Sequence, residues 1–418
     1  MAQLSDDCCA FGGPLMTTAE ALELLAERTA PVVGIETVDL RRARERILAE
    51  DVVATRDVPP TDNSAVDGYA VHYDDLDAQA ETRLPVAGRA AAGHALGRAA
   101  GRGEAIRIFT GAAMPDGCDT VVMQEDCAVV GDQVSIAPGL KRGANRRLAG
   151  EDIRAGTTIL GRGRRLRPQD IGLAAAVGRA ELRVYRPLRV AVFSTGDELH
   201  EPRDDPPFGS IYDSNRYGLM ALLEGLGCAV SDLGILEDRL QVIGDALAGA
   251  AADHELIITS GGMSVGEEDH VKAAVEALGS LYFWRLAIKP GRPLGLGQIR
   301  GVPFIGLPGN PVAMMVTFMR IARPVILRLG GAADLAPNIF RVPAGFAHKK
   351  KAGRREWVRA RLVADAEGRL VASKFPRDGA GILSSMVEAD GLVELSEDIT
   401  RLEPGAVVDF LPFNEVSR

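Results

Sequence analysis

Residues 255–266, ELIITSGGMSVG, pass from an apolar run into a turn rich in glycine and serine, and the residues that follow have helical composition. This order predicts a strand, a tight turn and a helix. The same texture repeats around it. Strands are predicted at 189–195 (RVAVFST), 230–236, 255–260 and 281–288, and helices at 215–226, 240–251 and 268–278.

Alternating strands and helices predict a parallel sheet wrapped by helices. A further buried strand at 302–307 and a helix at 311–329 complete an α/β domain of about residues 186–330. Pro311 lies near the start of that helix, where its missing amide proton costs nothing.

The residues before this domain predict two different structures. Residues 17–28 (TTAEALELLAER) and 169–177 predict helices, and the turn-rich passage 52–64 predicts a boundary near 55. Between about 65 and 150 the pattern predicts a small β-rich domain, in which 88–103 is expected to be a loop. Its β-like runs are 105–109, 120–123 and 133–136.

The residues after the α/β domain return to the alternation of a strand. Following Gly330-Gly331, this period-2 pattern predicts a C-terminal β domain. Its runs are 356–362, 370–373, 391–395 and 406–410.

Length and composition agree with several ordinary domains. The chain has 418 residues, more than the roughly 250–300 at which single cores stop growing. It is 46% hydrophobic and 25% charged, with a formal charge of −9 and interspersed signs, so no nucleic-acid partner is expected. No apolar run approaches the ~18 residues of a membrane span.

The cysteines and the N-terminus indicate a reduced, cytoplasmic setting. The five cysteines form an odd set without paired metal-ligand spacing. Residues 1–14 carry Asp6 and Asp7 and lack the basic and apolar regions of a signal peptide. The five are Cys8, Cys9, Cys118, Cys127 and Cys228.

The glycine- and serine-rich turn at 259–266 is a candidate anion site. Glycines allow close approach to backbone amides, and a helix N-terminus adds unpaired donors and a favourable dipole. The carboxyl end of a parallel strand is also where open α/β sheets bind ligands. The alternative is a tight strand–helix connection without a ligand.

Three carboxylates follow three predicted strand ends. Glu198, Asp238 and Asp269 could together hold Mg²⁺ beside a phosphate, because magnesium prefers oxygen ligands. Asp269 alone could equally be a helix cap.

Three cations surround the predicted strand at 281–288 and the proline-fixed turn after it. Arg285, Lys289 and Arg292 suit a tetrahedral oxyanion or a phosphate, although a solvated edge is the alternative. The turn Leu307-Pro308-Gly309-Asn310-Pro311, taken alone, favours a structural role. There is no histidine pair with zinc-ligand spacing, no G-x-S-x-G, no Walker A motif and no C-x-x-C.

The ordered set of motifs, rather than any one of them, resembles the molybdopterin molybdenumtransferase family, which includes the gephyrin E domain. The resemblance covers about residues 15–415. It rests on Pro60 with Asn63-Ser64-Ala65-Val66-Asp67-Gly68-Tyr69-Ala70, Phe109-Thr110-Gly111, Gly150-Glu151-Asp152-Ile153, Ser194-Thr195-Gly196-Asp197-Glu198-Leu199, Ser260-Gly261-Gly262 with Ser264, Gly266 and Asp269, Lys289-Pro290-Gly291-Arg292-Pro293, and Leu307-Pro308-Gly309-Asn310-Pro311.

The resemblance implies a multi-domain α/β plus β fold and an elongated homodimer. The expected parts are a discontinuous helical domain (15–56 and 153–185), a β-rich insertion (57–152), a three-layer molybdopterin-binding α/β domain (186–330) and a C-terminal β barrel (337–418). It also implies the reaction, in which adenylylated molybdopterin and molybdate give molybdenum cofactor and AMP with Mg²⁺ as cofactor. Contact with other enzymes of the cofactor is expected, and contact with a membrane is not.

The family's site residues are carried over position by position. Asp67, Thr110 and Asp152 match groups contributed across the dimer, and Glu198, Asp238 and Asp269 match ligands of the cation or substrate. Together with Lys289 these are the candidate catalytic residues. The candidate substrate-binding residues are Ser260, Gly261, Gly262, Ser264, Gly266, Arg285, Arg292, Pro308, Pro311, Arg354, Arg359, Ser384 and Ser385.

Three departures from the family pattern and two alternative functions remain. Val66 stands where methionine is expected, Arg292 where lysine is common, and Ala313 where a serine is expected, so a hydroxyl contact there is in doubt. The α/β part alone also resembles the adenylyltransferase that makes the intermediate, and the whole chain could be a scaffold. The motifs around Asp67, Thr110 and Asp152 favour the transferase.

Overall fold

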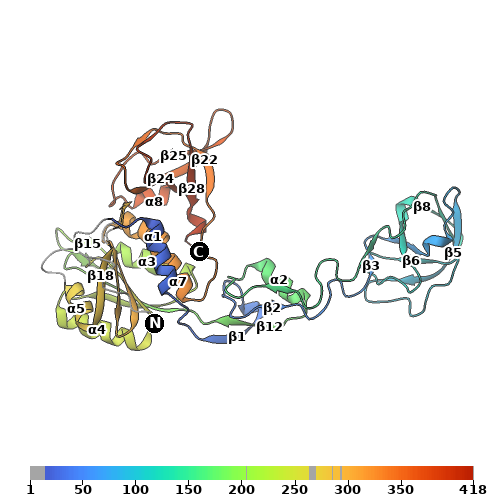
Figure 1. Cartoon of the computed structure of the whole chain (residues 1–418), viewed down its shortest axis with the longest axis horizontal. Coiled ribbons are helices and arrows are strands. Elements are labelled where there is room, and N and C mark those ends of the chain that lie inside the picture. The colour runs from blue at the N-terminus through green and yellow to red at the C-terminus, as the bar shows by residue number, and fades with distance from the viewer. Residues whose placement is uncertain (1–14, 204, 263–269, 285, 292–293, 418) are drawn as a thin grey trace.

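The computed structural model describes residues 15–203, 205–262, 270–284, 286–291 and 294–417. The chain is elongated, with an α/β body and a C-terminal β domain at one end (Figure 1). A narrow neck leads to a separate β domain at the other end. Among the described residues, no helix has both the length and the apolar character needed to cross a bilayer.

The body is built on a six-stranded sheet in which four neighbouring strands are parallel. The fifth strand of the sheet, β20, runs antiparallel to both of its neighbours, so the predicted parallel sheet contains one antiparallel strand that was not predicted. Along the sheet the order is β16 (Ala229–Leu236), β13 (Arg189–Thr195), β17 (Leu256–Ser260), β21 (Val302–Leu307), β20 (Leu294–Ile299) and β18 (Gly279–Trp284).

The unpredicted strand β20 forms a hairpin with β21. The turn uses Arg300 (φ 47°) and Gly301 (φ 85°), two positive-φ residues in succession, as tight hairpins require. Glycines at 295 and 297 weaken the β signal of this strand in the sequence. The run predicted as one strand over 281–288 is divided, because β18 ends at Trp284 and β19 (Ile288–Lys289) joins another sheet.

Helices cover both faces of the central sheet and make three layers. Val190 and Val192 of β13 pack with Leu219 on one face, whereas Ala191 and Phe193 pack with Ile243 on the other. This alternation is the period-2 pattern of a strand buried on both sides. Helix α3 (Ser214–Gly225) lies on the first face, and α4 (Leu240–Asp253) and α5 (His270–Leu278) lie on the second.

The helix predicted over 311–329 contains a π-helical segment. It consists of α6 (Pro311–Thr317), η5 (Phe318–Ala322) and α7 (Arg323–Leu329). Pro324 has no amide proton to donate and its ring would clash in a regular turn, so a widened turn accommodates it.

The N-terminal helix α1 (Thr18–Arg28) packs on this long helix. Thr17 caps it in a reciprocal box, since its hydroxyl accepts from the amide of Glu20 at 3.2 Å and its amide donates to the Glu20 carboxylate at 2.8 Å. Ala21 and Leu25 are buried in the core of the α/β body.

The neck brings together residues from both sides of the β insertion. Strand β1 (Ile35–Asp39) pairs antiparallel with β12 (Glu181–Tyr185), and β2 (Val52–Val53) pairs with β11 (Thr158–Leu160). With α2 (Pro168–Ala176) they enclose a small core that includes Leu48, Leu166 and Val184. Short strands β3 (Asn63–Ser64) and β10 (Arg146–Arg147) pair where the distal domain begins.

The distal domain is a second six-stranded sheet. β5 continues to Ala90, so the residues at the start of the predicted loop 88–103 are strand instead. The order is β7 (Thr120–Met123), β4 (Gly68–Val71), β6 (Ala105–Ile108), β5 (Thr82–Ala90), β9 (Gln133–Ile136) and β8 (Cys127–Val130).

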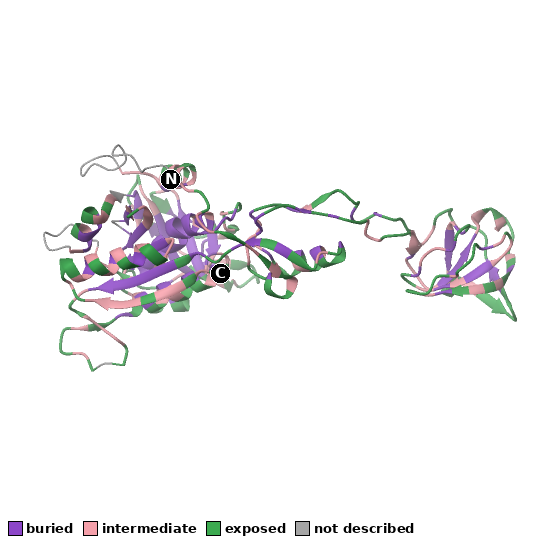
Figure 2. Ribbon diagram, turned by 90° about the horizontal axis from the view of Figure 1, so that it is seen from below, coloured by how far each residue is buried: buried purple, intermediate pink, exposed green. Residues whose placement is uncertain are grey.

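The C-terminal domain is a β barrel-like sheet that includes two residues of the α/β segment. Strand β19 pairs in parallel with the long strand β24, with Lys289 opposite Glu356. Buried residues run through strands of the body and of the distal domain (Figure 2). The C-terminal order is β19, β24 (Arg355–Ala364), β26 (Gly391–Leu395), β28 (Val407–Pro412) and β22 (Phe340–Pro343), with β25 (Leu370–Lys374) on β24, β23 (His348–Lys349) paired with β27 (Arg401–Leu402), and helix α8 (Ser384–Glu388).

The start of α2 provides a test of neck stability. Asp170 is buried and accepts hydrogen bonds from Arg167 and Arg164. Burial opposes ionisation, but these two arginines outweigh it and lower the pKa of Asp170 to about 2. The contribution of Asp170 to stability is therefore complete above its unfolded pKa near 4 and is lost as the pH falls toward 2.

We expect Asp170→Asn to destabilise the neck by about 2 kcal/mol at pH 7 and by much less near pH 2. Urea unfolding followed by circular dichroism between pH 2 and pH 7 measures this difference. Glu181→Gln, an exposed change on β12, is the control and should be nearly neutral. A difference that did not depend on pH would show that the charge of Asp170 is unimportant.

Candidate functional site

The carboxyl ends of β13, β17 and β21 meet at one edge of the central sheet. The amide of Gly261 donates to the carbonyl of Leu307 at 3.1 Å, and the Ser260 hydroxyl donates to the carbonyl of Pro308 at 3.1 Å. Asn215, at the start of α3, donates from Nδ2 to Ser260 Oγ at 2.9 Å and to the Gly309 carbonyl at 2.7 Å. These bonds join two loops and a helix start into one rigid edge.

The first residues of the predicted anion-binding turn need to be glycine. Gly261 and Gly262 have φ values of +93° and +62°, which residues with a Cβ atom rarely adopt. A Cβ on Gly262 would lie 2.7 Å from both Thr195 Oγ1 and Val271 Cγ2. The predicted residues Ser264, Gly266 and Asp269 lie outside the described residues.

Two of the three predicted carboxylates follow neighbouring strands at this edge. Thr195 of β13 pairs with Leu236 of β16, so Glu198 and Asp238 leave the sheet side by side. Glu198 is exposed and curls back over Gly196, while Asp238 is half-buried. Neither side chain makes a hydrogen bond or ion pair with another described residue, so their oxygens suit a hard cation. Outside 263–269 and the other undescribed positions, no three potential metal-ligating residues cluster.

A buried arginine anchors the loop between β13 and α3. Arg216 is 2% exposed and forms ion pairs with Asp213, Asp232 and Glu201. Burial lowers the pKa of Arg216, but the hydrogen bonds of Asp213 and Asp232 outweigh burial and raise it. The network fixes this loop, which includes β14 (Leu199–His200) and β15 (Ile211–Tyr212), beside Glu198.

A cavity of about 250 Å³ lies between the α/β body and the C-terminal domain. The body contributes the turn after β19 and the loop after β21, and the C-terminal domain contributes β24 and the residues after β25. Its lining is Lys289, Pro290, Gly291, Pro308, Asn310, Ala313, Glu356, Trp357, Val358, Arg359, Asp378, Gly379 and Ala380.

Each carboxylate of the cavity has a basic partner. Lys289 Nζ donates to Glu356 Oε1 at 2.6 Å, and His348 Nε2 lies 3.1 Å from the same oxygen. Asp378 pairs with Lys374 at 3.0 Å. Burial opposes ionisation of Asp378, but Lys374 lowers its pKa.

Arg359 is the cation of the cavity without a carboxylate partner among the described residues. Its Nε donates to Ser385 Oγ at 3.0 Å, and Nη2 donates to the carbonyls of Arg377 and Gly379 at 3.3 and 3.2 Å. Arg359 is 7% exposed, and burial lowers the pKa of its guanidinium. A desolvated guanidinium held only by neutral acceptors is a strong receptor for an oxyanion.

The remaining predicted residues divide into those at the cavity and those away from it. Pro308 lines the cavity directly. Arg354 lies behind Glu356, with its Nη2 4.0 Å from Glu356 Oε2, and Ser384 is exposed on α8. Pro311 begins α6 next to the lining residue Asn310. Arg285 and Arg292 lie outside the described residues.

The three predicted residues of the insertion belong to the distal domain and its junction with the neck. Asp67 accepts from the amide and hydroxyl of Thr110, both at 2.8 Å, and these hydrogen bonds lower the pKa of Asp67. They adjoin β4 and β6, far from the α/β body within one chain (Figure 1). Asp152 is exposed, and its amide bonds the carbonyl of Val58.

Sequence reasoning missed Asn215, Glu356, His348 and Asp378. Asn215 had a local signal, since Asp213-Ser214-Asn215 stands at the start of a predicted helix, where such residues cap or make polar contacts. Long-range pairing of strands in the C-terminal domain places Glu356 and Asp378 at the cavity and His348 against Glu356, and single-sequence periodicity does not reveal such pairing.

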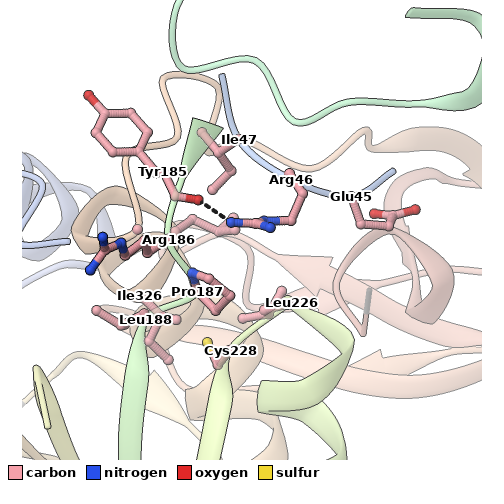
Figure 3. Close-up of a pocket in the computed structure, with 13 residues that line it drawn as sticks. Glu45, Arg46, Ile47, Tyr185, Arg186, Pro187, Leu188, Leu226, Cys228 and Ile326 are labelled. Carbon is pink, nitrogen blue, oxygen red and sulfur yellow. Dashed lines mark hydrogen bonds between the residues drawn. The ribbon is translucent and has the colours of Figure 1, made fainter. Parts of the chain in front are cut away.

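A second hollow, at the junction of neck and body, is too small for a substrate. Its volume is about 30 Å³, and it is crossed by the bond from Arg46 Nη2 to the Tyr185 carbonyl at 2.8 Å (Figure 3). Such a volume holds little more than water.

Comparisons with known proteins cover nearly the whole chain. Residues 16–178 match the MoeA N-terminal region (domain I and II), 191–328 a probable molybdopterin binding domain, and 341–413 the MoeA C-terminal region (domain IV). A molybdopterin molybdenumtransferase of Haemophilus influenzae is 37% identical over 96% of this chain and 100% of its own length. One from Nostoc sp. is 41% identical over 73% of this chain and 72% of its own.

A solved structure shows the same architecture. The crystal structure of the molybdopterin biosynthesis moeA protein from Pyrococcus horikoshii OT3 matches with a TM-score of 0.84 and 28% identity. The match covers 96% of this chain and 100% of that one.

The glycine edge can be tested with a matched pair of substitutions. Gly262→Ala places a Cβ against Thr195 and Val271 at positive φ, and we expect a loss of roughly 1–2 kcal/mol with a lower thermal midpoint. Gly249→Ala, in α4 with open space around it, should be neutral or stabilising by up to about 1 kcal/mol. Differential scanning calorimetry compares them, and equal midpoints would contradict the steric argument.

Proposed function

The chain belongs to the molybdopterin molybdenumtransferase (MoeA) family, and from this premise we propose that it inserts molybdenum from molybdate into adenylylated molybdopterin, releasing AMP and forming molybdenum cofactor. The observation that carries the proposal is the adjacency of two features that suit an anion. Pro308 belongs both to the glycine-rich sheet edge, through its bond from Ser260, and to the wall of the basic cavity.

Each feature has a part in the proposed reaction. The turn that begins at Gly261 and Gly262 would receive a phosphate of the nucleotide intermediate, because its backbone can approach closely. Arg359 and Lys289 would hold the molybdate oxyanion in the cavity next to it. Holding both substrates at one edge supplies the proximity that a transfer reaction needs.

Magnesium fits the two described carboxylates at the same edge. Glu198 and Asp238, with Asp269, would hold it, and the bound ion would supply positive charge that offsets the pyrophosphate. The oxygen-only donor set favours this ion over a softer metal.

The protein thiols in the described part of the chain are unsuited to hold the transferred metal. The described cysteines, Cys118, Cys127 and Cys228, are free, and burial raises the pKa of Cys228 and of Cys118 to about 12. The thiolates that bind molybdenum would thus come from the pterin. Reduced cysteines also fit a reaction in the cytoplasm.

A homodimer would bring the distal domain into the site. Asp67 and Thr110 are remote from the cavity of their own chain, so they would act on the cavity of a second copy, near which Asp152 would also lie. The intermediate and the finished cofactor would be exchanged with other enzymes of the same synthesis.

We expect purified protein to release AMP from adenylylated molybdopterin only when both molybdate and Mg²⁺ are present. Glu198→Gln and Asp238→Asn should each raise the Mg²⁺ concentration for half-maximal rate about tenfold or more, since each removes a charged ligand. Glu237→Gln is the matched control, because Glu237 neighbours Asp238 but pairs with Arg239. AMP release without molybdate would contradict the proposed coupling.

A shared site predicts complementation between two inactive variants. At a Mg²⁺ concentration that supports the wild type but lies well below the raised requirement of Glu198→Gln, Asp67→Asn and Glu198→Gln homodimers should both be nearly inactive. After subunit exchange, equal amounts should recover about one quarter of wild-type activity, because half of the dimers then hold one intact site of two. No recovery, with exchange confirmed by mass spectrometry, would place Asp67 outside the partner's site.

A further inference from the structure

In the cavity between the two domains, a carboxylate of the protein itself already pairs with one of the two lining cations. Glu356 is 3% exposed, lies on β24 and receives Lys289 Nζ at 2.6 Å. The lysine side chain is 44% exposed, so it still faces the cavity from which a ligand would approach. A ligand that uses Lys289 must therefore share it with a carboxylate of the protein.

Glu356 is surrounded by basic groups from several elements. His348 Nε2 of β23 lies 3.1 Å from Oε1, Arg354 lies 4.0 Å from Oε2, and Lys350 is a further positive charge nearby. Oε2 is buried and has no hydrogen-bond partner among the described residues. The carboxylate thus keeps compensating charges when Lys289 turns away from it, which makes the pair separable.

Arg359 lines the same cavity but, unlike Lys289, has no carboxylate partner among the described residues. Its described hydrogen-bond partners are a hydroxyl and two carbonyls, and Asp378 and Glu356 attract it without forming an ion pair, so its guanidinium remains available to an anion. The cavity therefore combines one unmatched cation with one cation that is matched by an internal anion. A singly charged anion can be satisfied at Arg359 but gains little by displacing Glu356 from Lys289.

We propose that Glu356 is a specificity-determining counter-anion, which a doubly charged oxyanion displaces from Lys289 and a singly charged anion such as chloride does not. This inference rests on the proposed oxyanion role of the cavity. The physical basis is that a dianion gains about twice the Coulomb attraction of a monoanion at the same two cations, whereas the cost of separating Glu356 from Lys289 is the same for both. Lys289 therefore exchanges Glu356 for a ligand that carries more negative charge than the single charge of the carboxylate.

A purely structural role of the Glu356–Lys289 pair predicts the opposite change in anion affinity. If the pair only locks β19 to β24, then loss of Glu356 should loosen the cavity and weaken anion binding. If Glu356 competes with the ligand, its neutral isostere should strengthen molybdate binding and should also let a monoanion reach Lys289. The sign of the change separates the two cases.

The test is calorimetric titration of the full-length protein with molybdate, at low and at high chloride, without the pterin substrate. We expect Glu356→Gln to bind molybdate about fivefold or more tightly at low chloride, because a nearby negative charge is gone. We expect added chloride to compete with molybdate in this variant much more than in the wild type. Glu397→Gln, which removes a partner of Arg355 in the same domain, is the control and should match the wild type.

A second substitution tests whether the effect acts through Lys289. In a Lys289→Met background, Glu356→Gln should strengthen binding much less than it does alone. If Glu356→Gln does not fold, Glu356→Asp, whose shorter side chain draws the carboxylate away from Lys289, should change affinity in the same direction.

Three outcomes would overturn the inference. Weaker or unchanged molybdate binding by folded Glu356→Gln, with normal binding by the wild type, rejects the counter-anion and leaves the proposed function standing. An equal effect with and without Lys289 rejects the exchange of partners. No molybdate binding by the wild-type protein rejects the oxyanion cavity, and the counter-anion with it.

Discussion

Two residues that leave one domain to join the sheet of another determine the geometry of the candidate site. Ile288 and Lys289 lie in sequence between β18 and β20 of the α/β sheet but pair in parallel with β24 of the C-terminal domain. The amide of Arg355 also donates to the carbonyl of Ala287 at 2.7 Å, so the connection is made by backbone bonds, which do not depend on side-chain conformation. The cavity between the domains exists because this pairing holds its two walls in register.

The polar contacts around the cavity reinforce that pairing. Glu394 of β26 accepts from Trp357 Nε1 at 3.0 Å and pairs with Arg320 of the long helix at 3.0 Å. Val312, at the start of α6, donates to the Ala380 carbonyl at 2.9 Å. Buried groups satisfied across a domain boundary resist separation, because parting them would leave charges unpaired in a dry interior. The body and C-terminal domain therefore provide a preformed site.

Much of the architecture could be predicted because local patterns determine it. The runs at 189–195 and 255–260 are apolar enough to specify buried strands, and the capping box at Thr17 marks the start of a helix. Strand β20 escaped prediction because two glycines dilute its pattern. The distinction between Arg354 and Arg359 also escaped it, since only the pairing of β24 places Arg359 at the cavity and Arg354 behind Glu356. The sequence therefore shows which residues have suitable chemistry. Which of these residues contact one another depends on pairing between strands that are distant in sequence.

The neck described above acts mechanically as a lever arm. Short antiparallel ribbons, β1 with β12, β2 with β11 and β3 with β10, and the helix α2 connect the body to the distal sheet (Figure 1). A thin beam bends more readily than the bodies at its ends, and a small angular change at its root is multiplied along its length. A small bend of the neck would therefore move Asp67 and Thr110 a long way relative to the body. Thermal bending of the neck, rather than motion of local loops, would set how fast those two residues approach and leave whatever surface they meet.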